Sequence, residues 1–320
     1  MNRTFATIYH GKSFAAIASA LFCILGVAGC SRGIAQTSAK PQLPPVEYLG
    51  FWGVKGDAPG QLKDPSGIAT DSFGDVYITD AGNQTIEKFS AKGKPLLSFQ
   101  EGALKQPQSI AVDSGGGIYV TDPVRGSVFV FFPEGDRYRE LRVKTKSSSE
   151  DELSVAIGDD GRVHVLDEDA GKVFNYSAPP FRAAPPWLVP VSALDAKARR
   201  GPIAAGSDGY IYVADPAGNR ILRFAGDGHF SSEIDLSSAG ARDRLSSVFT
   251  VFSGYIFVLG ADGHTLHVVP TDGQRPTVAD LLPQLGPGGA TASALAVSVN
   301  RELFVLDGPN AHVLSFRINF

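Results

Sequence analysis

Residues 67–89 read GIATDSFGDVYITDAGNQTIEKF, and this stretch decides the fold because it recurs along the chain. Five further segments align with it without a gap, and their first residues lie 42 to 48 residues apart. That spacing is typical of repeats that each form one four-stranded propeller blade. The sequence therefore predicts an all-β, six-bladed β-propeller. The six copies are 67–89, 109–131, 154–176, 202–224, 247–269 and 294–316.

Each copy contains a short strand, a turn, a β-branched and aromatic strand, a second turn and a third strand. The first turn carries glycine in five copies, and glycine supplies positive φ at low cost. The sixth copy has Arg301 there, so we expect strain or a different turn in that blade. The five glycines are Gly74, Gly116, Gly161, Gly209 and Gly254.

The second strand ends in aspartate in five copies. A ring of carboxylates suggests metal binding, but an aspartate at a strand end also accepts hydrogen bonds from the backbone N–H groups of the next turn. Every blade needs that turn, so we expect a turn-capping role. The five residues are Asp80, Asp122, Asp167, Asp215 and Asp307.

The sixth copy reaches Phe320 just after its third strand and leaves no segment for an outer strand. Residues 46–53, VEYLGFWG, are strand-like and stand alone before the first copy. Placing them beside the last copy closes the ring and covers an open sheet edge. Other outer strands are expected in the variable segments between copies, at 95–99, 138–144, 187–194 and 233–236.

Two stretches carry a resemblance to a known repeat family. The run PSGIATD at 65–71, followed by VYITDAGN at 76–83, resembles NHL repeats, and so does IYVADPAGNRILRF at 211–224. Copies three, five and six depart from the pattern at His164, Gly260 and Pro309. The resemblance implies an NHL-like propeller over 46–320 and leaves the function open, because propellers host scaffolds and enzymes alike.

The N-terminus has the layout of a secretory signal. Arg3 and Lys12 precede an uncharged stretch at 14–29, which is shorter than the roughly 20 apolar residues that span a bilayer. The following VAGC ending at Cys30 resembles the bacterial lipobox. This resemblance implies a signal peptide at 1–29, acyl chains such as palmitate on Cys30, and a lipoprotein anchored to the membrane of the cell envelope.

Residues 30–45 lack apolar periodicity and contain Pro44 and Pro45, which predicts a flexible tether between the lipidated cysteine and the propeller. Ser31 after the cysteine implies, by the same resemblance, sorting to the outer membrane with the propeller facing the periplasm. The chain has two cysteines, Cys23 and Cys30, so the mature domain forms no disulfide. With 29 basic and 33 acidic residues the chain lacks the positive charge of nucleic-acid-binding domains.

The alternative hypothesis is an enzyme. It rests on a resemblance to propellers such as gluconolactonase or the peptide-amidating lyases, which hold a metal in the central channel. At the channel mouth we expect Ser66, Gln108, Leu153, Gly201, Ser246 and Ser293, which include no set of carboxylates. His264 and His267 are three apart on a strand and point to opposite faces. We therefore expect no catalytic residue, metal or cofactor, and a metal-dependent hydrolase or lyase remains the alternative.

The turns after the second strands carry polar residues that vary between blades on a constant scaffold. Such variation is typical of recognition loops, and it is equally typical of exposed turns that are free to hold any polar residue. We expect a non-catalytic scaffold that binds a protein partner through this loop face, while peptidoglycan and polysaccharide remain open. The expected contact residues are Asn83, Arg125, Lys172, Arg220, His264 and His312.

Overall fold

The computed structural model describes residues 45–100, 102–143, 152–190, 201–236, 245–260, 262–272, 277–281 and 292–320. The chain divides into two units, Met1–Gln42 and Leu43–Phe320, and the description concerns the second. The signal-like segment, Cys30 and most of the expected tether lie outside the described residues. Within the described ranges, no helix has the length and apolar character needed to cross a membrane.

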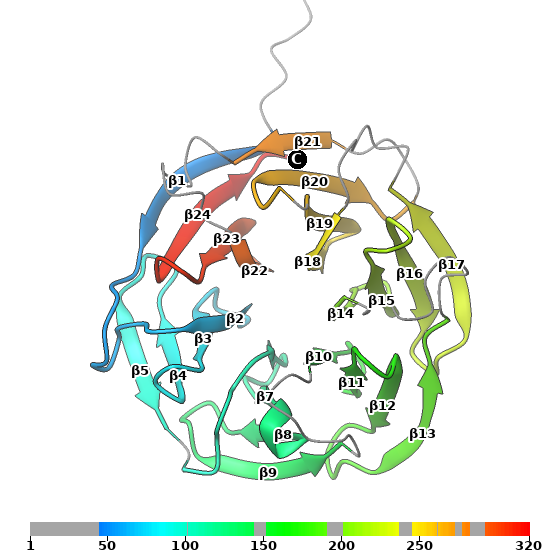
Figure 1. Cartoon of the computed structure of the whole chain (residues 1–320), viewed down its shortest axis with the longest axis horizontal. Coiled ribbons are helices and arrows are strands. Elements are labelled where there is room, and N and C mark those ends of the chain that lie inside the picture. Colours follow the sequence, from blue (N-terminus) through cyan, green and yellow to red (C-terminus); the bar gives the residue numbers. More distant parts are fainter. Residues whose placement is uncertain are drawn as a thin grey trace, which may run out of the picture. The chain divides into compact units, whose positions relative to one another are not determined.

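The described unit consists of six four-stranded antiparallel sheets, arranged as the blades of a propeller (Figure 1). Inner strands are β2 (Pro65–Thr70), β6 (Ile110–Val112), β10 (Leu153–Ile157), β14 (Ile203–Ala205), β18 (Leu245–Phe252) and β22 (Ala292–Val297). Second strands are β3 (Val76–Asp80), β7 (Ile118–Asp122), β11 (Val163–Asp167), β15 (Tyr210–Asp215), β19 (Tyr255–Gly260) and β23 (Glu302–Asp307). Blades 1 to 6 are numbered in this order.

Third strands are β4 (Thr85–Phe89), β8 (Ser127–Phe131), β12 (Lys172–Tyr176), β16 (Arg220–Ala225), β20 (Thr265–Pro270) and β24 (His312–Ile318). Outer strands are β5 (Pro95–Phe99), β9 (Arg137–Arg142), β13 (Ala183–Leu188), β17 (Phe230–Asp235), β21 (Thr277–Asp280) and β1 (Val46–Trp52). One short 3-10 helix, η1 (Pro123–Arg125), joins β7 to β8. The prediction of an all-β, six-bladed propeller is confirmed.

Blade 6 is completed by the N-terminal strand, as the sequence predicts. β1 pairs antiparallel with β24, from Val46 opposite Ile318 to Trp52 opposite Val313. Ring contacts reinforce the pairing, with Tyr48 against Phe316. The two strands lie side by side in Figure 1, and the last blade therefore has four strands.

The hydrophobic core is distributed over the contacts between neighbouring blades. Six clusters of buried side chains are found in the described part of the chain, one at each blade boundary. Between blades 6 and 1, for example, Phe304 and Val313 pack with Ile78 and Phe89. The second strands are buried at nearly every position because both of their faces meet another blade.

The first turn of blade 6 keeps the geometry of its counterparts although it carries Arg301. Arg301 has φ of 59°, and its N–H bonds to the carbonyl of Ser298 at 3.0 Å, as Gly209 bonds to Gly206 in blade 4. The backbone of Arg301 is therefore strained, as expected, but the turn has the same geometry as the glycine-containing turns of blades 1 to 4. Blade 5 has the different turn, a two-residue hairpin with positive φ at Ser253 and Gly254.

Three predicted outer strands are displaced from their observed positions. β5 has the predicted bounds, whereas β9, β13 and β17 begin earlier than 138, 187 and 233. The sequence of β13 is AAPPWL. Its first residues were not predicted as a strand because proline has no N–H to donate to the ladder. Proline is tolerated here because β13 lies at the edge of its sheet.

Candidate functional site: the loop face and the central channel

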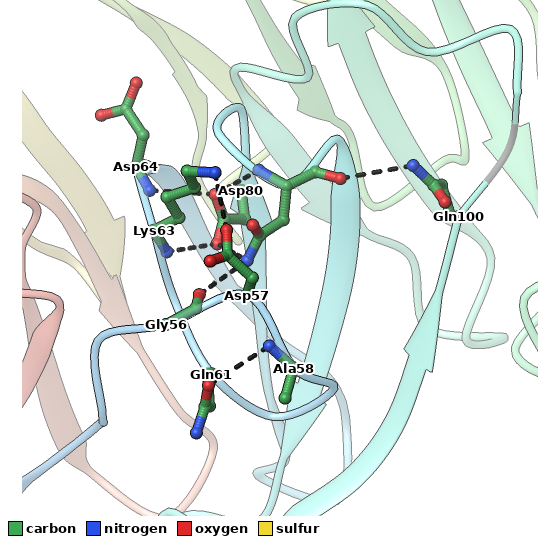
Figure 2. A network of polar contacts seen from close by, with 9 residues as sticks. Gly56, Asp57, Ala58, Gln61, Lys63, Asp64, Asp80 and Gln100 are labelled. Atoms are coloured by element: carbon green, nitrogen blue, oxygen red, sulfur yellow. Dashed lines mark hydrogen bonds and ion pairs between the residues drawn. The ribbon is translucent and has the colours of Figure 1, made fainter.

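The turns between second and third strands form the loop face, and their strand-end aspartates hold them in place. Asp80 accepts hydrogen bonds from the backbone N–H groups of Asn83, Lys63 and Asp64 at 3.1, 2.7 and 3.0 Å. Figure 2 shows its carboxylate beside Lys63 and Asp64. This one side chain therefore caps its own turn and fastens the segment that leads into β2.

The same arrangement recurs in the other blades that carry the aspartate. In blade 2, Asp122 accepts from the N–H groups of Lys105, Gln106 and Arg125. In the remaining three blades the carboxylate accepts from the N–H three residues later, from Ala170 to Asp167, Gly218 to Asp215 and Asn310 to Asp307. These contacts assign the aspartates a structural part in the loop face.

Two of the expected contact residues are occupied by contacts within the blade. The side-chain amide of Asn83 donates to the carbonyl of Gly56 at 3.0 Å and to Asp80 at 3.1 Å. Arg220 is ion-paired with Asp215 at 2.9 Å and with Glu233 on β17. The hydrogen bond with Asp215 raises the pKa of Arg220.

Three further expected residues are half-buried. The Lys172 ammonium lies 5.1 Å from the centre of the Phe174 ring. His312 lies against Phe51, with 4.9 Å between ring centres. His264 lies near Asp262, with 3.6 Å between Nε2 and Oδ2. These side chains are thus partly shielded by their own blades.

Arg125 differs from the other five because it is exposed at a rigid turn. It ends η1, where Asp122 accepts its N–H and Gly126 follows with φ of 59°. Its guanidinium makes no hydrogen bond or ion pair with the described residues. Val124 beside it is 36% exposed. In blade 2 the loop face therefore presents an exposed guanidinium that has no partner among the described residues, on a turn capped by Asp122.

The six inner strands enclose a central channel with a cavity of about 500 Å³. The inner strands surround the centre of the ring in Figure 1. Much of the wall is alanine, valine and isoleucine, including Ala69, Ala111, Ala156 and Ala204. A cavity of this size is within the range of small-molecule sites.

Polar groups near the loop-face end of the channel largely connect neighbouring blades. The Thr79 hydroxyl donates to the carbonyl of Gln108, and the Thr121 hydroxyl donates to that of Leu153 at 3.0 Å. Ser154 accepts from the N–H of Ile203 at 3.1 Å. These side chains therefore link neighbouring blades, and Ser154 also lines the channel.

Two carboxylates line the channel, and neither is among the six residues expected at its mouth. They belong to Glu152 and Glu168, which both come from blade 3. The N–H of Glu168 donates to the carbonyl of Glu152 at 3.1 Å, and the Glu168 side chain is buried. A signal was available in the aligned copies, where the position after the strand-end residue is alanine, proline or glycine everywhere except at Glu168.

No histidine is among the described residues that line the channel. His164 is buried in blade 3, where Nδ1 lies 2.8 Å from Oδ1 of Asn175, and burial lowers its pKa. His267 is buried within β20, while His264 precedes that strand. Among the residues that the structure describes, no three histidine, cysteine or acidic side chains form a group suited to a metal ion.

Solved structures with the same fold include enzymes. A streptogramin B lyase is 16% identical, with a TM-score of 0.58 over 86% of this chain and 87% of that chain. Virginiamycin B lyase from Staphylococcus aureus is 14% identical, with a TM-score of 0.57 over 86% and 89%. A gluconolactonase from Xanthomonas campestris is 16% identical, with a TM-score of 0.57 over 81% and 88%. At these identities the likeness establishes the fold alone.

Sequence comparison identifies the repeat itself. A search of curated proteins found no match. Residues 62–89 and 104–131 match the NHL repeat family. These ranges end where the first two aligned copies end, and they begin at the segments that Asp80 and Asp122 fasten. With six four-stranded blades around one channel, the chain is a six-bladed β-propeller whose first two blades match the NHL repeat.

Proposed function

We propose that this propeller is a non-catalytic binding protein of the bacterial cell envelope, which recognises a protein partner through its loop face. The observation that carries the proposal is Arg125, an exposed guanidinium on a turn fixed by Asp122 and Gly126. Arginine is enriched among the residues that dominate interface energies, and a preformed backbone lowers the cost of ordering on binding. Val124 adds an apolar contact beside it.

The proposal includes an acyl anchor at Cys30 and an outer-membrane location facing the periplasm. Its support is the lipobox-like VAGC after the basic and apolar segments of the N-terminus. The Cys30→Ala variant is expected to lose acylation and to fractionate as a water-soluble protein. Membrane association that survives this change would contradict the anchor.

Affinity capture from the native envelope, followed by binding measurements, tests the partner. Arg125→Ala is expected to weaken binding at least about fivefold, since anchors at hot spots contribute more than about 1 kcal/mol. Arg139→Ala, on the exposed outer strand β9, is the control on another face and should leave the affinity unchanged. Because the Arg139 guanidinium donates to the carbonyl of Pro180 at 2.6 Å, the melting temperature of this variant is measured as well. If Arg139→Ala weakens binding and Arg125→Ala does not, the contact lies on the outer strands. If peptidoglycan or polysaccharide is captured, the partner is not a protein.

Arg220→Ala separates binding from folding in the same assay. Arg220 joins Asp215 to Glu233, so its removal is expected to lower stability. Arg125→Ala should leave the melting temperature unchanged while it weakens binding. If both variants lose binding only in proportion to their loss of stability, Arg125 is not a contact residue.

A second candidate function is a channel-based hydrolase or lyase resembling gluconolactonase. The observation that favours it is the cavity of about 500 Å³ with Glu152 and Glu168 in its wall. Elemental analysis and a screen of lactone and ester hydrolysis test it directly. Turnover that is lost in Glu168→Gln but kept in Arg125→Ala would replace the binding proposal with the enzyme.

A further inference from the structure

The end of the propeller opposite the loop face carries exposed apolar side chains in blades 6 and 1. Phe73 is 82% exposed and Val299 is 55% exposed, each in the turn between a first and a second strand. The corresponding turns of blades 2, 3 and 4 carry only polar residues or glycine at these two positions. Those residues are Ser114, Gly115, Asp159, Asp160, Ser207 and Asp208.

These side chains belong to one continuous surface. A Cβ on Gly74 would lie 2.6 Å from Nδ2 of Asn300, so the turns of blades 1 and 6 adjoin. The Arg301 guanidinium donates to the carbonyl of Phe320 at 3.1 Å, and the exposed Phe320 ring lies against Tyr255. We call Phe73, Val299, Arg301 and Phe320 the membrane-side patch.

The described chain begins beside this patch. The N–H of Asn319 donates to the carbonyl of Pro45 at 3.1 Å, and Val46 pairs with Ile318. Cys30 lies fifteen residues earlier in the sequence. Even a fully extended chain spans no more than about 3.6 Å per residue, so Cys30 lies within roughly 50 Å of this end of the propeller.

We infer that the membrane-side patch rests on the lipid bilayer that holds Cys30, an inference that depends on the proposed acyl anchor. Phe73 and Val299 would enter the interfacial region, and Arg301 would face anionic headgroups. Lys88 lies 3.1 Å from Asp71 and 3.1 Å from Asp75, so it offsets one of their two charges. The patch is too small to bind a membrane alone, so it would add to the attachment that the acyl chains on Cys30 provide.

This arrangement also orients the loop face. The strands of a blade are antiparallel, so the turns before the second strands and the turns after them lie at opposite ends of the ring. With the patch on the bilayer, Arg125 would project away from the lipid. The proposed partner would then approach from the side of the periplasm.

Quenching by brominated lipids tests the contact with the mature chain, residues 30–320. Cys30 is its single cysteine, so its thiol can be coupled to a maleimide lipid in phosphatidylethanolamine and phosphatidylglycerol vesicles. Phe73→Trp introduces a reporter at the patch, and Val124→Trp introduces the matched reporter on the loop face. The wild-type chain, with Trp52 and Trp187, gives the background.

We expect brominated acyl chains to quench the added Phe73→Trp emission at least twofold and to leave that of Val124→Trp unchanged. Without coupling, neither reporter should be quenched, because the patch binds only when tethered. Complete coupling with no quenching at position 73, or equal quenching at both positions, would overturn the inference. Chemical coupling makes this outcome independent of acylation in the cell, which mass spectrometry of the native protein tests separately.

Discussion

Arg301 shows that the blade keeps its first turn in one conformation even where the residue is not glycine. Arginine adopts φ of 59° there, in the left-handed region that glycine adopts at four equivalent turns. A non-glycine residue in this region costs roughly 1–3 kcal/mol, and the surrounding strand pairs must compensate. The pairing of β22 with β23 and of β23 with β24 on either side supplies that compensation.

Replacing Arg301 with glycine should therefore stabilise the propeller. The expected gain in unfolding free energy is up to about 1 kcal/mol, because relief of strain exceeds the entropy that glycine loses on folding. Urea unfolding measures it. Gly209→Ala is the reciprocal control, since φ is 79° and no atom lies within 4 Å of the added Cβ, and it should destabilise by about 1 kcal/mol. A loss of stability in Arg301→Gly would contradict this account.

His164 makes stability depend on pH. Burial lowers its pKa from the ordinary value of 6.5, so the unfolded chain takes up a proton before the folded chain does. The stability that the neutral ring provides is complete above pH 6.5 and falls as the pH drops toward the lower folded value. Below that value the loss is constant.

His164→Phe should remove this contribution, because phenylalanine occupies the equivalent position in blades 5 and 6, at Phe257 and Phe304. The unfolding free energies of the two proteins, compared at pH 7.5 and pH 5, measure the effect. The wild type should lose more stability on acidification than the variant does. Equal losses would show that His164 is protonated as readily when folded as when unfolded.

At the scale of elements, each outer strand connects its blade to the next one. A Cβ on Gly93 in blade 1 would lie 2.3 Å from Cγ of Trp52 on β1, and Gly228 stands in the same relation to Trp187 on β13. The two indoles also pack on Phe89 and Phe224, with ring centres 4.9 and 4.6 Å apart. Glycine in these turns thus admits a large ring from the preceding blade.

Removal of the closing strand is the corresponding test. Deleting residues 46–53 should lower the melting temperature, because β24 would become an unpaired edge and Trp52 would leave the boundary with blade 1. Trp52→Ala alone should cost about 3 kcal/mol in urea unfolding. Phe51→Ala is the control, because Phe51 is 60% exposed, and it should cost less than about 1 kcal/mol. An unchanged stability after the deletion would contradict closure through β1.

At the scale of the whole molecule, the repeat predicted more of the fold than of the site. The 23-residue frame fixed the number of blades, and the segment left over at 46–53 identified the closing strand. Outer strands were misplaced because they are largely exposed and lack an apolar pattern, as in β9 and β13. The side chains of Asn83 and Arg220 are held by Gly56 and Glu233, which lie outside the frame. Their contacts could therefore not be read from the aligned copies.

The pairing of β1 with β24 has a mechanical consequence for a tethered propeller. Tension applied through the residues before Val46 enters β1 at that residue. It passes to the rest of the ring through the hydrogen bonds to β24, which joins its blade at His312, and through the covalent continuation of the chain at Gly53. Val46 lies at the opposite end of the paired strands from His312 and Gly53. A pull between the membrane and the loop face therefore loads the strand pair in shear, so that its hydrogen bonds resist together instead of opening one after another.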